Sequence, residues 1–197
     1  PAYVAAEEAR YAIQAGAQEI DTVIDYAEWI DGDRDIVQEK IEAVAEVCKE
    51  EGAALKVILK ATAHKTEKSL ADAAKMACEA GADFVKTCTG KVPLKGYGNG
   101  QPDASTLKLG QAVIKAVGEY NRENGTDIGV KISGGVKTAE DCGYYLGLVE
   151  TALGEDFVSA DKFRFGASSL LANLRADIDG DKPAPTNAQA PKPSNDY

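Results

Sequence analysis

The sequence has a single histidine, His64, and this scarcity excludes two kinds of active site. A multi-histidine metal centre needs several imidazoles, and a Ser-His-Asp triad is excluded as well. His64 lies beside Lys65 in an expected loop, so we interpret it as a solvated side chain. The cysteines form neither a CxxC pair nor a zinc spacing, which favours reduced thiols and a cytoplasmic chain. They are Cys48, Cys78, Cys88 and Cys142.

Positive charge is also scarce, since 22 Lys and Arg residues face 32 Asp and Glu residues and the formal net charge is −10. This balance argues against nucleic acid and anionic membranes as partners, because both require basic patches. No run of 18 apolar residues exists, so no membrane-spanning helix is expected. The start, Pro1–Val4, lacks the basic and apolar segments of a signal peptide.

What is present is an alternation of helix-like and strand-like segments. Apolar residues at helical spacing, often followed by glycine, predict helices. These cover about residues 3–15, 34–51, 67–80, 105–124, a stretch from about 138, and 168–178. Short apolar runs between them predict strands at residues 19–26, 55–60, 84–89, 128–133 and 163–166, and residues 96–102 are expected to form a loop.

Five strand–helix units after one leading helix indicate an α/β fold with a parallel sheet covered by helices. The strands look like continuous apolar runs, which predicts that apolar layers cover both faces of the sheet. We expect one domain over residues 1–179, since 44% apolar residues suffice for a well-buried core. Residues 180–197 contain four prolines and few apolar residues, which predicts a flexible tail.

Two lysines lie within apolar strand-like runs, Lys86 in Ala82–Gly90 and Lys131 in Ile128–Gly135. A buried lysine is costly unless it has a partner or loses its proton. Two on successive strands suggest that one amine is a nucleophile and the other the cation that lowers its pKa. The alternative is that both strands are sheet edges whose amines reach solvent.

Glycine-rich turns follow the last two strands. In Ser133–Asp141, two glycines precede Thr138, a candidate helix N-cap with Asp141 three residues later. Phe165–Leu170 repeats the arrangement at the next strand end. Free N–H groups at a helix start suit an anion, so these turns predict a phosphate pocket, although Gly-Gly also forms ordinary turns.

These motifs resemble the deoxyribose-phosphate aldolases, which are class I (Schiff-base) aldolases with a TIM (β/α)8 barrel. The resemblance extends over essentially the whole chain and is carried by four segments, 19–24, 83–91, 130–138 and 163–171. It implies a lyase that reversibly cleaves 2-deoxy-D-ribose 5-phosphate to acetaldehyde and D-glyceraldehyde 3-phosphate in deoxyribonucleotide catabolism. No cofactor or metal is implied, and a homodimer is compatible with the resemblance.

The resemblance also implies residue roles. Lys86 would be the Schiff-base nucleophile, Lys131 the neighbouring cation, and Asp21 would orient a water-containing proton relay with Lys131. Asp25 is the second choice for that carboxylate. Tyr197 matches a terminal tyrosine that assists proton transfer at the enamine carbon. The sugar and phosphate would contact Thr89, Lys91, Gly134, Gly135, Val136, Lys137, Gly166, Ser168 and Ser169.

Three positions depart from the family pattern. Cys88 stands where serine is common, Lys137 where arginine is frequent, and Lys60 where some members place glutamate. Lysine keeps the charge of arginine but loses its bidentate contact with phosphate.

The five predicted units match the fourth to eighth units of the family barrel. A barrel of this kind typically needs about 250 residues, and five strands do not close with its geometry. We therefore expect an N-terminally incomplete barrel, with a self-assembling half-barrel as the alternative. Two further functions stay open at this point: a class I aldolase for another sugar phosphate, and a catalytically silent phosphate-binding fragment.

Overall fold

The computed structural model describes residues 1–89 and 104–180, and the side chains from residue 108 onward in the second range. Lys91, the predicted loop at 96–102 and Tyr197 lie outside the described residues. So does the predicted tail, apart from Gly180.

Five parallel strands form one sheet in the order β1-β2-β3-β4-β5. The strands are β1 (Glu19–Val23), β2 (Ala54–Ile58), β3 (Phe84–Lys86), β4 (Gly129–Ser133) and β5 (Phe163–Gly166). Each strand pairs with the next one in the chain, as successive β/α units require. The structure confirms the predicted α/β fold with five parallel strands, which corresponds to part of a TIM barrel.

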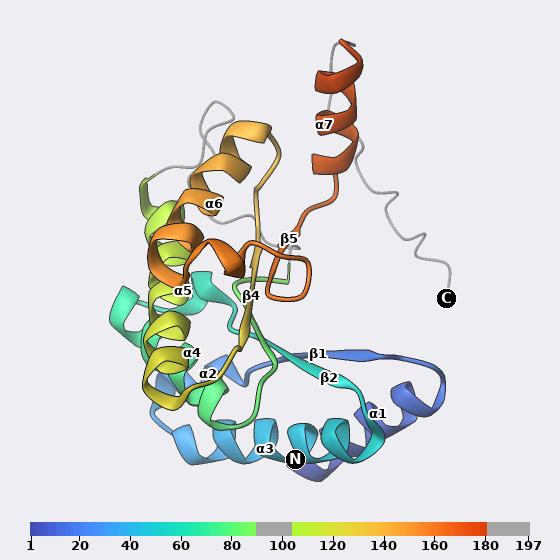
Figure 1. The fold of residues 1–197 in the computed structure, drawn as a ribbon. Helices are drawn as coiled ribbons and strands as arrows, with labels where there is room; N and C mark the ends of the chain where they lie inside the picture. The colour runs from blue at the N-terminus through green and yellow to red at the C-terminus, as the bar shows by residue number, and fades with distance from the viewer. Residues whose placement is uncertain (90–103, 181–197) are drawn as a thin grey trace, which may run out of the picture.

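Helices follow the strands and cover one face of the sheet (Figure 1). They are α1 (Ala2–Gln14), α2 (Tyr26–Asp31), α3 (Arg34–Glu51), α4 (Glu67–Glu79), α5 (Ala104–Asn124), α6 (Ala139–Leu153) and α7 (Leu170–Asp179), with short 3-10 turns η1 (Ala61–Ala63) and η2 (Glu155–Phe157). α1 packs on α3, α4 on α5, and α5 on α6. α7 rises from the end of β5 and stands away from this layer (Figure 1).

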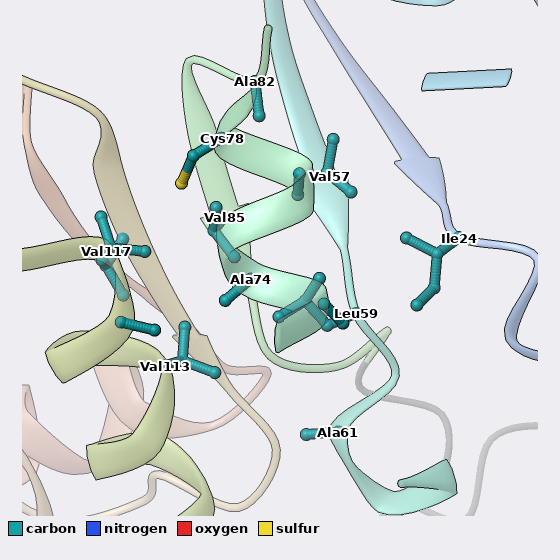
Figure 2. Close-up of a cluster of buried hydrophobic side chains, with 14 of the residues drawn as sticks. Ile24, Val57, Leu59, Ala61, Ala74, Cys78, Ala82, Val85, Val113 and Val117 are labelled. Carbon is teal, nitrogen blue, oxygen red and sulfur yellow. The ribbon is translucent and has the colours of Figure 1, made fainter. Parts of the chain in front are cut away.

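The sheet has one apolar face and one charged face, so the prediction of apolar layers on both faces is wrong. Alternate residues of a strand point to opposite faces. On β2, Leu55 and Val57 are fully buried in the hydrophobic core, whereas Lys56 between them points to the other face. Figure 2 shows Val57, Leu59 and Val85 packed with Ala74 and Cys78 of α4 and with Val113 and Val117 of α5. The charged face, called the inner face below, is where functional side chains can gather.

Helix α2 was not predicted, because its first residue was assigned to the preceding strand. Its Trp29 is buried and donates a hydrogen bond from Nε1 to Ser69 Oγ at 2.9 Å. His64 joins the same cluster, with Nδ1 at 3.1 Å from Ser69 Oγ and Nε2 at 3.0 Å from the Leu59 carbonyl oxygen. The prediction of a solvated His64 is therefore wrong, and burial lowers the pKa of its imidazole.

Among the residues that the structure describes, no helix is long and apolar enough to cross a membrane.

Candidate active site

The inner face brings together six charged side chains from all five strands of the sheet, and two of them are carboxylates. Asp21 of β1 accepts hydrogen bonds from two lysines, from Lys86 Nζ to Oδ2 at 2.8 Å and from Lys56 Nζ to Oδ1 at 2.8 Å. Burial raises the pKa of Asp21, but the hydrogen bonds from Lys56 and Lys86 outweigh it, so the net pKa lies below its usual value. Asp21 therefore stays ionised and ties β1 to both β2 and β3.

Lys56 extends this network to a second carboxylate. Its ammonium also forms an ion pair with Glu19, and Arg164 Nη1 lies 2.6 Å from the other Glu19 oxygen. Arg164 in turn stacks on Phe84, 4.1 Å from the ring centre. Only 2% of Lys56 is exposed, and the hydrogen bonds to Asp21 and Glu19 outweigh its burial and raise its pKa. This lysine is a fixed cation at the base of the site.

Lys86 and Lys131 are register partners on β3 and β4. They are therefore level on adjacent strands and point to the same face, as the hypothesis that the two amines are neighbours requires. Both strands are interior to the sheet and Lys86 is buried, which rules out the alternative of exposed edge lysines. Burial lowers the pKa of Lys131, and the nearby Lys56 and Lys86 cations lower it further. Within the described part of the chain, no ion pair engages Lys131.

A cavity of about 350 Å³ lies at the carboxyl ends of β3, β4 and β5. It contains both lysines and every predicted sugar- or phosphate-contacting residue that the structure describes. The lining residues are Lys86, Thr89, Lys131, Ser133, Gly134, Gly135, Val136, Lys137, Gly166, Ala167, Ser168 and Ser169. The amine end and the glycine-rich turns thus belong to one continuous space.

The turn after β4 is shaped by backbone conformation and by a helix cap. Gly134 and Gly135 have φ angles of +103° and +93°, a region that favours glycine. The predicted capping box at Thr138 and Asp141 is confirmed. However, Asp141 Oδ2 accepts hydrogen bonds from the N–H groups of Lys137 and Thr138. The prediction that these N–H groups are free to bind an anion is therefore wrong. Donors for an anion must come from the glycine turn and from side chains.

The remaining predicted residues have other surroundings. Asp21 is not among the residues that line this cavity, and it lines a larger one between α1 and β1. Asp25, the second-choice carboxylate, pairs with Lys40 at 2.7 Å, at the start of α2. Lys91 and Tyr197 lie outside the described residues.

Lys60 follows β2 and has a φ of +52°, in the left-handed region. The N–H groups on either side of it, of Leu59 and Ala61, bond to the consecutive carbonyl oxygens of Lys86 and Thr87. The segment after β2 therefore has one residue more than the segment that it faces, as in a β-bulge, and Lys60 is the extra residue beside Lys86. The Lys60 ammonium lies 3.7 Å from the ring centre of Tyr26.

Four residues of the site were not predicted: Glu19, Lys56, Ser133 and Arg164. Lys56 carried the signal that identified the other two lysines, a cation inside an apolar strand. Arg164 carried the same signal, between Phe163 and Phe165 of β5. Glu19 is the first residue of β1, where charge is ordinary, so only the sheet register shows that it faces inward.

The chain matches a family model described as DeoC/LacD family aldolase over residues 2–175. It is similar to a tetrameric deoxyribose phosphate aldolase from Aeropyrum pernix, with 27% identity and a TM-score of 0.62. It is also similar to two proteins that are provisionally identified as deoxyribose-phosphate aldolases. The one from Toxoplasma gondii has 26% identity and a TM-score of 0.71, and the one from Coccidioides immitis has 27% identity and a TM-score of 0.65. These matches cover 90%, 90% and 88% of this chain, in that order.

The same matches cover only part of the other proteins. The chain spans 62%, 66% and 57% of the Aeropyrum, Toxoplasma and Coccidioides proteins. Their length exceeds that of this chain, in keeping with five strands where a full barrel has eight. Because the family model extends over nearly the whole described chain, the chain belongs to the DeoC/LacD family of aldolases.

Proposed function

We propose that this chain carries the reaction centre of a deoxyribose-phosphate aldolase, which cleaves 2-deoxy-D-ribose 5-phosphate through a Schiff base on Lys86. The observation that carries the proposal is the pair of level lysines, Lys86 and Lys131, at one end of a cavity whose other end is a glycine-rich turn. A substrate with a carbonyl at one end and a phosphate at the other fits that arrangement. The sequence motifs and the names of the similar proteins support the same substrate.

In the proposed reaction, the neutral Lys86 amine adds to the substrate aldehyde and the carbinolamine loses water to give an iminium ion. The iminium nitrogen then accepts the electron pair of the C2–C3 bond as that bond breaks, and the C3 hydroxyl loses its proton to become the aldehyde of glyceraldehyde 3-phosphate. Protonation of the enamine carbon and hydrolysis release acetaldehyde and return the amine.

The charges of the inner face act on Lys131. The inner face has four basic groups against two carboxylates, and both carboxylates are engaged by Lys56. Burial lowers the pKa of Lys131, and the nearby Lys56 and Lys86 cations favour its neutral form further. Lys131, whose pKa is lowered, is the group best suited to exchange protons with the bound substrate. Asp21 holds the Lys86 side chain, and the implied water relay from Asp21 to Lys131 stays a prediction.

At the other end of the cavity, we propose that the phosphate binds the turn at Gly134–Val136, the Lys137 side chain and the turn at Gly166–Ser169. A lysine there gives charge without a bidentate contact. Lys91 and Tyr197 keep their proposed roles in phosphate binding and enamine protonation, which the described residues do not test.

We further propose a cytoplasmic homo-oligomer that acts in deoxyribonucleotide catabolism. All four cysteines are free and buried, as in reducing compartments. The similar Aeropyrum protein is tetrameric, which supports an oligomer, and a homodimer is the smallest one.

The test is borohydride trapping in the presence of acetaldehyde. We expect an ethyl group on Lys86, located by peptide mass spectrometry, and none in Lys86→Ala. Release of acetaldehyde from deoxyribose 5-phosphate, compared with cleavage of fructose phosphates, distinguishes the proposed substrate from another sugar phosphate. An unmodified Lys86 would instead support the silent phosphate-binding fragment.

A further inference from the structure

The hydroxyl of Ser133 stands out because it is buried without a hydrogen-bond partner. Among the residues that the structure describes, Ser133 Oγ is the sole buried side-chain nitrogen or oxygen in this condition. Only 1% of the residue is exposed. A buried hydroxyl without a partner costs about 1–3 kcal/mol, so its presence here calls for a reason.

The backbone of Ser133 is fixed, so the hydroxyl cannot find a partner by a small shift of the chain. Thr87 Oγ1 donates to the Ser133 carbonyl oxygen at 2.8 Å and accepts from the Ser133 N–H at 2.9 Å. Thr87 is as buried as Ser133 and follows Lys86 directly. The two neighbouring hydroxyls therefore differ sharply: that of Thr87 is satisfied twice, and that of Ser133 not at all.

The Ser133 hydroxyl lies beside the side chain of Lys131. A Cβ on Gly166 would be 2.3 Å from Ser133 Oγ and 3.1 Å from Lys131 Cε, so both atoms border the space that the missing side chain leaves. Ser133 and Lys131 are two residues apart on β4 and share its inner face. Both line the same cavity.

A hydroxyl is a partner that suits an amine in either protonation state. It accepts a hydrogen bond from an ammonium and donates one to a neutral amine, whereas a carboxylate would favour the charged form. The Ser133 hydroxyl makes no hydrogen bond in this structure. We infer that Ser133 is a positioning residue whose hydroxyl pairs with the Lys131 amine, in either protonation state, when that amine turns to the cavity. This rests on the proposed function, in which Lys131 exchanges protons during the reaction.

The charged acceptors near Lys131 already have partners, so a neutral group is left to pair with its amine. The charged residues that face it across the inner face are Glu19 and Asp21 on β1, Lys56 on β2, Lys86 on β3 and Arg164 on β5. Lys56 and Lys86 engage Asp21, and Lys56 and Arg164 engage Glu19. With both carboxylates occupied, Ser133 Oγ is an acceptor beside Lys131 that no other described group engages.

The experiment compares Ser133→Ala with Thr87→Val, which removes the satisfied hydroxyl next to it. Steady-state kinetics with deoxyribose 5-phosphate, thermal unfolding and an NMR titration of the Lys131 side chain are measured for each. For Ser133→Ala we expect kcat to fall about tenfold with KM changed less than about twofold, the worth of one hydrogen bond to a reacting group. We expect its Tm to change little, because the hydroxyl makes no hydrogen bond in the resting structure. The pKa of Lys131 in this variant should fall further, because a hydrogen bond to the Ser133 hydroxyl stabilises the ammonium more than the neutral amine.

Thr87→Val should show a different set of changes. Its Tm should fall by several degrees, because it leaves the Ser133 backbone groups unsatisfied. A Ser133→Ala protein with wild-type kcat and an unchanged Lys131 pKa would overturn the inference, and so would a loss of Tm equal to that of Thr87→Val. If the wild-type protein forms no adduct on Lys86, the proposed function fails. The NMR titration needs no turnover and still decides whether Ser133 contacts Lys131.

Discussion

Arg164 Nη1 lies 2.6 Å from Glu19 Oε2, so an ion pair joins the last strand of the sheet to the first. The two residues are 145 positions apart in the chain. β1 and β5 are the opposite edges of the sheet, and their side chains meet only because the sheet curves toward its inner face. The ion pairs of that face therefore form one connected network, in which removing a single partner affects groups on several strands.

Lys56→Met should destabilise the protein by about 1–3 kcal/mol. Breaking a fully buried ion pair costs about 3–5 kcal/mol, and the lower figure allows for the partial exposure of both carboxylates. Their side chains are 27% exposed for Glu19 and 37% for Asp21. Urea denaturation at neutral pH measures the effect.

Lys68→Met is the matched control for that change. Lys68 pairs with Asp72 on the surface of α4 and its side chain is 82% exposed. The expected loss is below about 0.5 kcal/mol. Similar losses in the two variants would mean that the Lys56 network does not stabilise the fold.

Asp21 should make the stability of the protein sensitive to acid. Its folded pKa is lowered by the Lys56 and Lys86 hydrogen bonds against burial, so its stabilisation is present above the unfolded pKa, about 3.9. It is lost as pH falls from there through the lower folded pKa. We expect the free energy of unfolding of Asp21→Asn to be lower at neutral pH and to fall less below about pH 4. Urea denaturation across this range measures both, and parallel curves for the two proteins would contradict the assignment.

Much of the fold and half of the site followed from local sequence. Alternating segments predicted all five strands, and lysines in apolar runs predicted Lys86 and Lys131, because both signals lie within a few residues. The partners of Asp21 could not be predicted in this way. They depend on the register that sets Asp21 opposite Lys56, which arises from contacts between distant parts of the chain.

Short elements escaped prediction for a different reason. α2 has six residues, which is too short for a helical repeat of apolar residues to show in the sequence. The burial of His64 likewise depends on Trp29 and Ser69, which belong to separate helices. The charged inner face was not predicted, because a single charged residue in an apolar strand does not show that neighbouring strands place charges on the same face. The sheet register is needed to show that.

Lys131→Met should stabilise the protein while it removes activity. Burial and the Lys56 and Lys86 cations lower the pKa of Lys131, so its charged form is less favourable in the folded state. The free energy of unfolding should rise by about 0.5–2 kcal/mol at neutral pH, the range that is common for stabilising substitutions. It should shrink as pH rises toward about 10.4, where the amine is neutral in the unfolded chain too.

Thermal and urea unfolding at several pH values measure this gain. Lys115→Met, an exposed position on α5, should change stability by less than about 0.5 kcal/mol at every pH. A destabilised Lys131→Met protein would show that the amine has a stabilising partner in the folded state.

Gly166→Ala should damage both stability and activity. The new Cβ would fall 2.3 Å from Ser133 Oγ and 3.1 Å from Lys131 Cε, and Ser133 cannot retreat because Thr87 fixes its backbone. Overpacking of this kind costs about 1–3 kcal/mol. Displacement of Lys131 should lower kcat as well, measured with deoxyribose 5-phosphate.

Gly147→Ala is the control, since nothing lies within 4 Å of its Cβ position. It is inside α6, where alanine is the better helix former by about 0.8–1.0 kcal/mol, so this variant should be more stable and fully active. The contrast separates the loss of a glycine from the filling of one particular space. If Gly166→Ala keeps wild-type kcat, the Lys131 side chain is not confined by that space, and its position beside Ser133 has no bearing on the reaction.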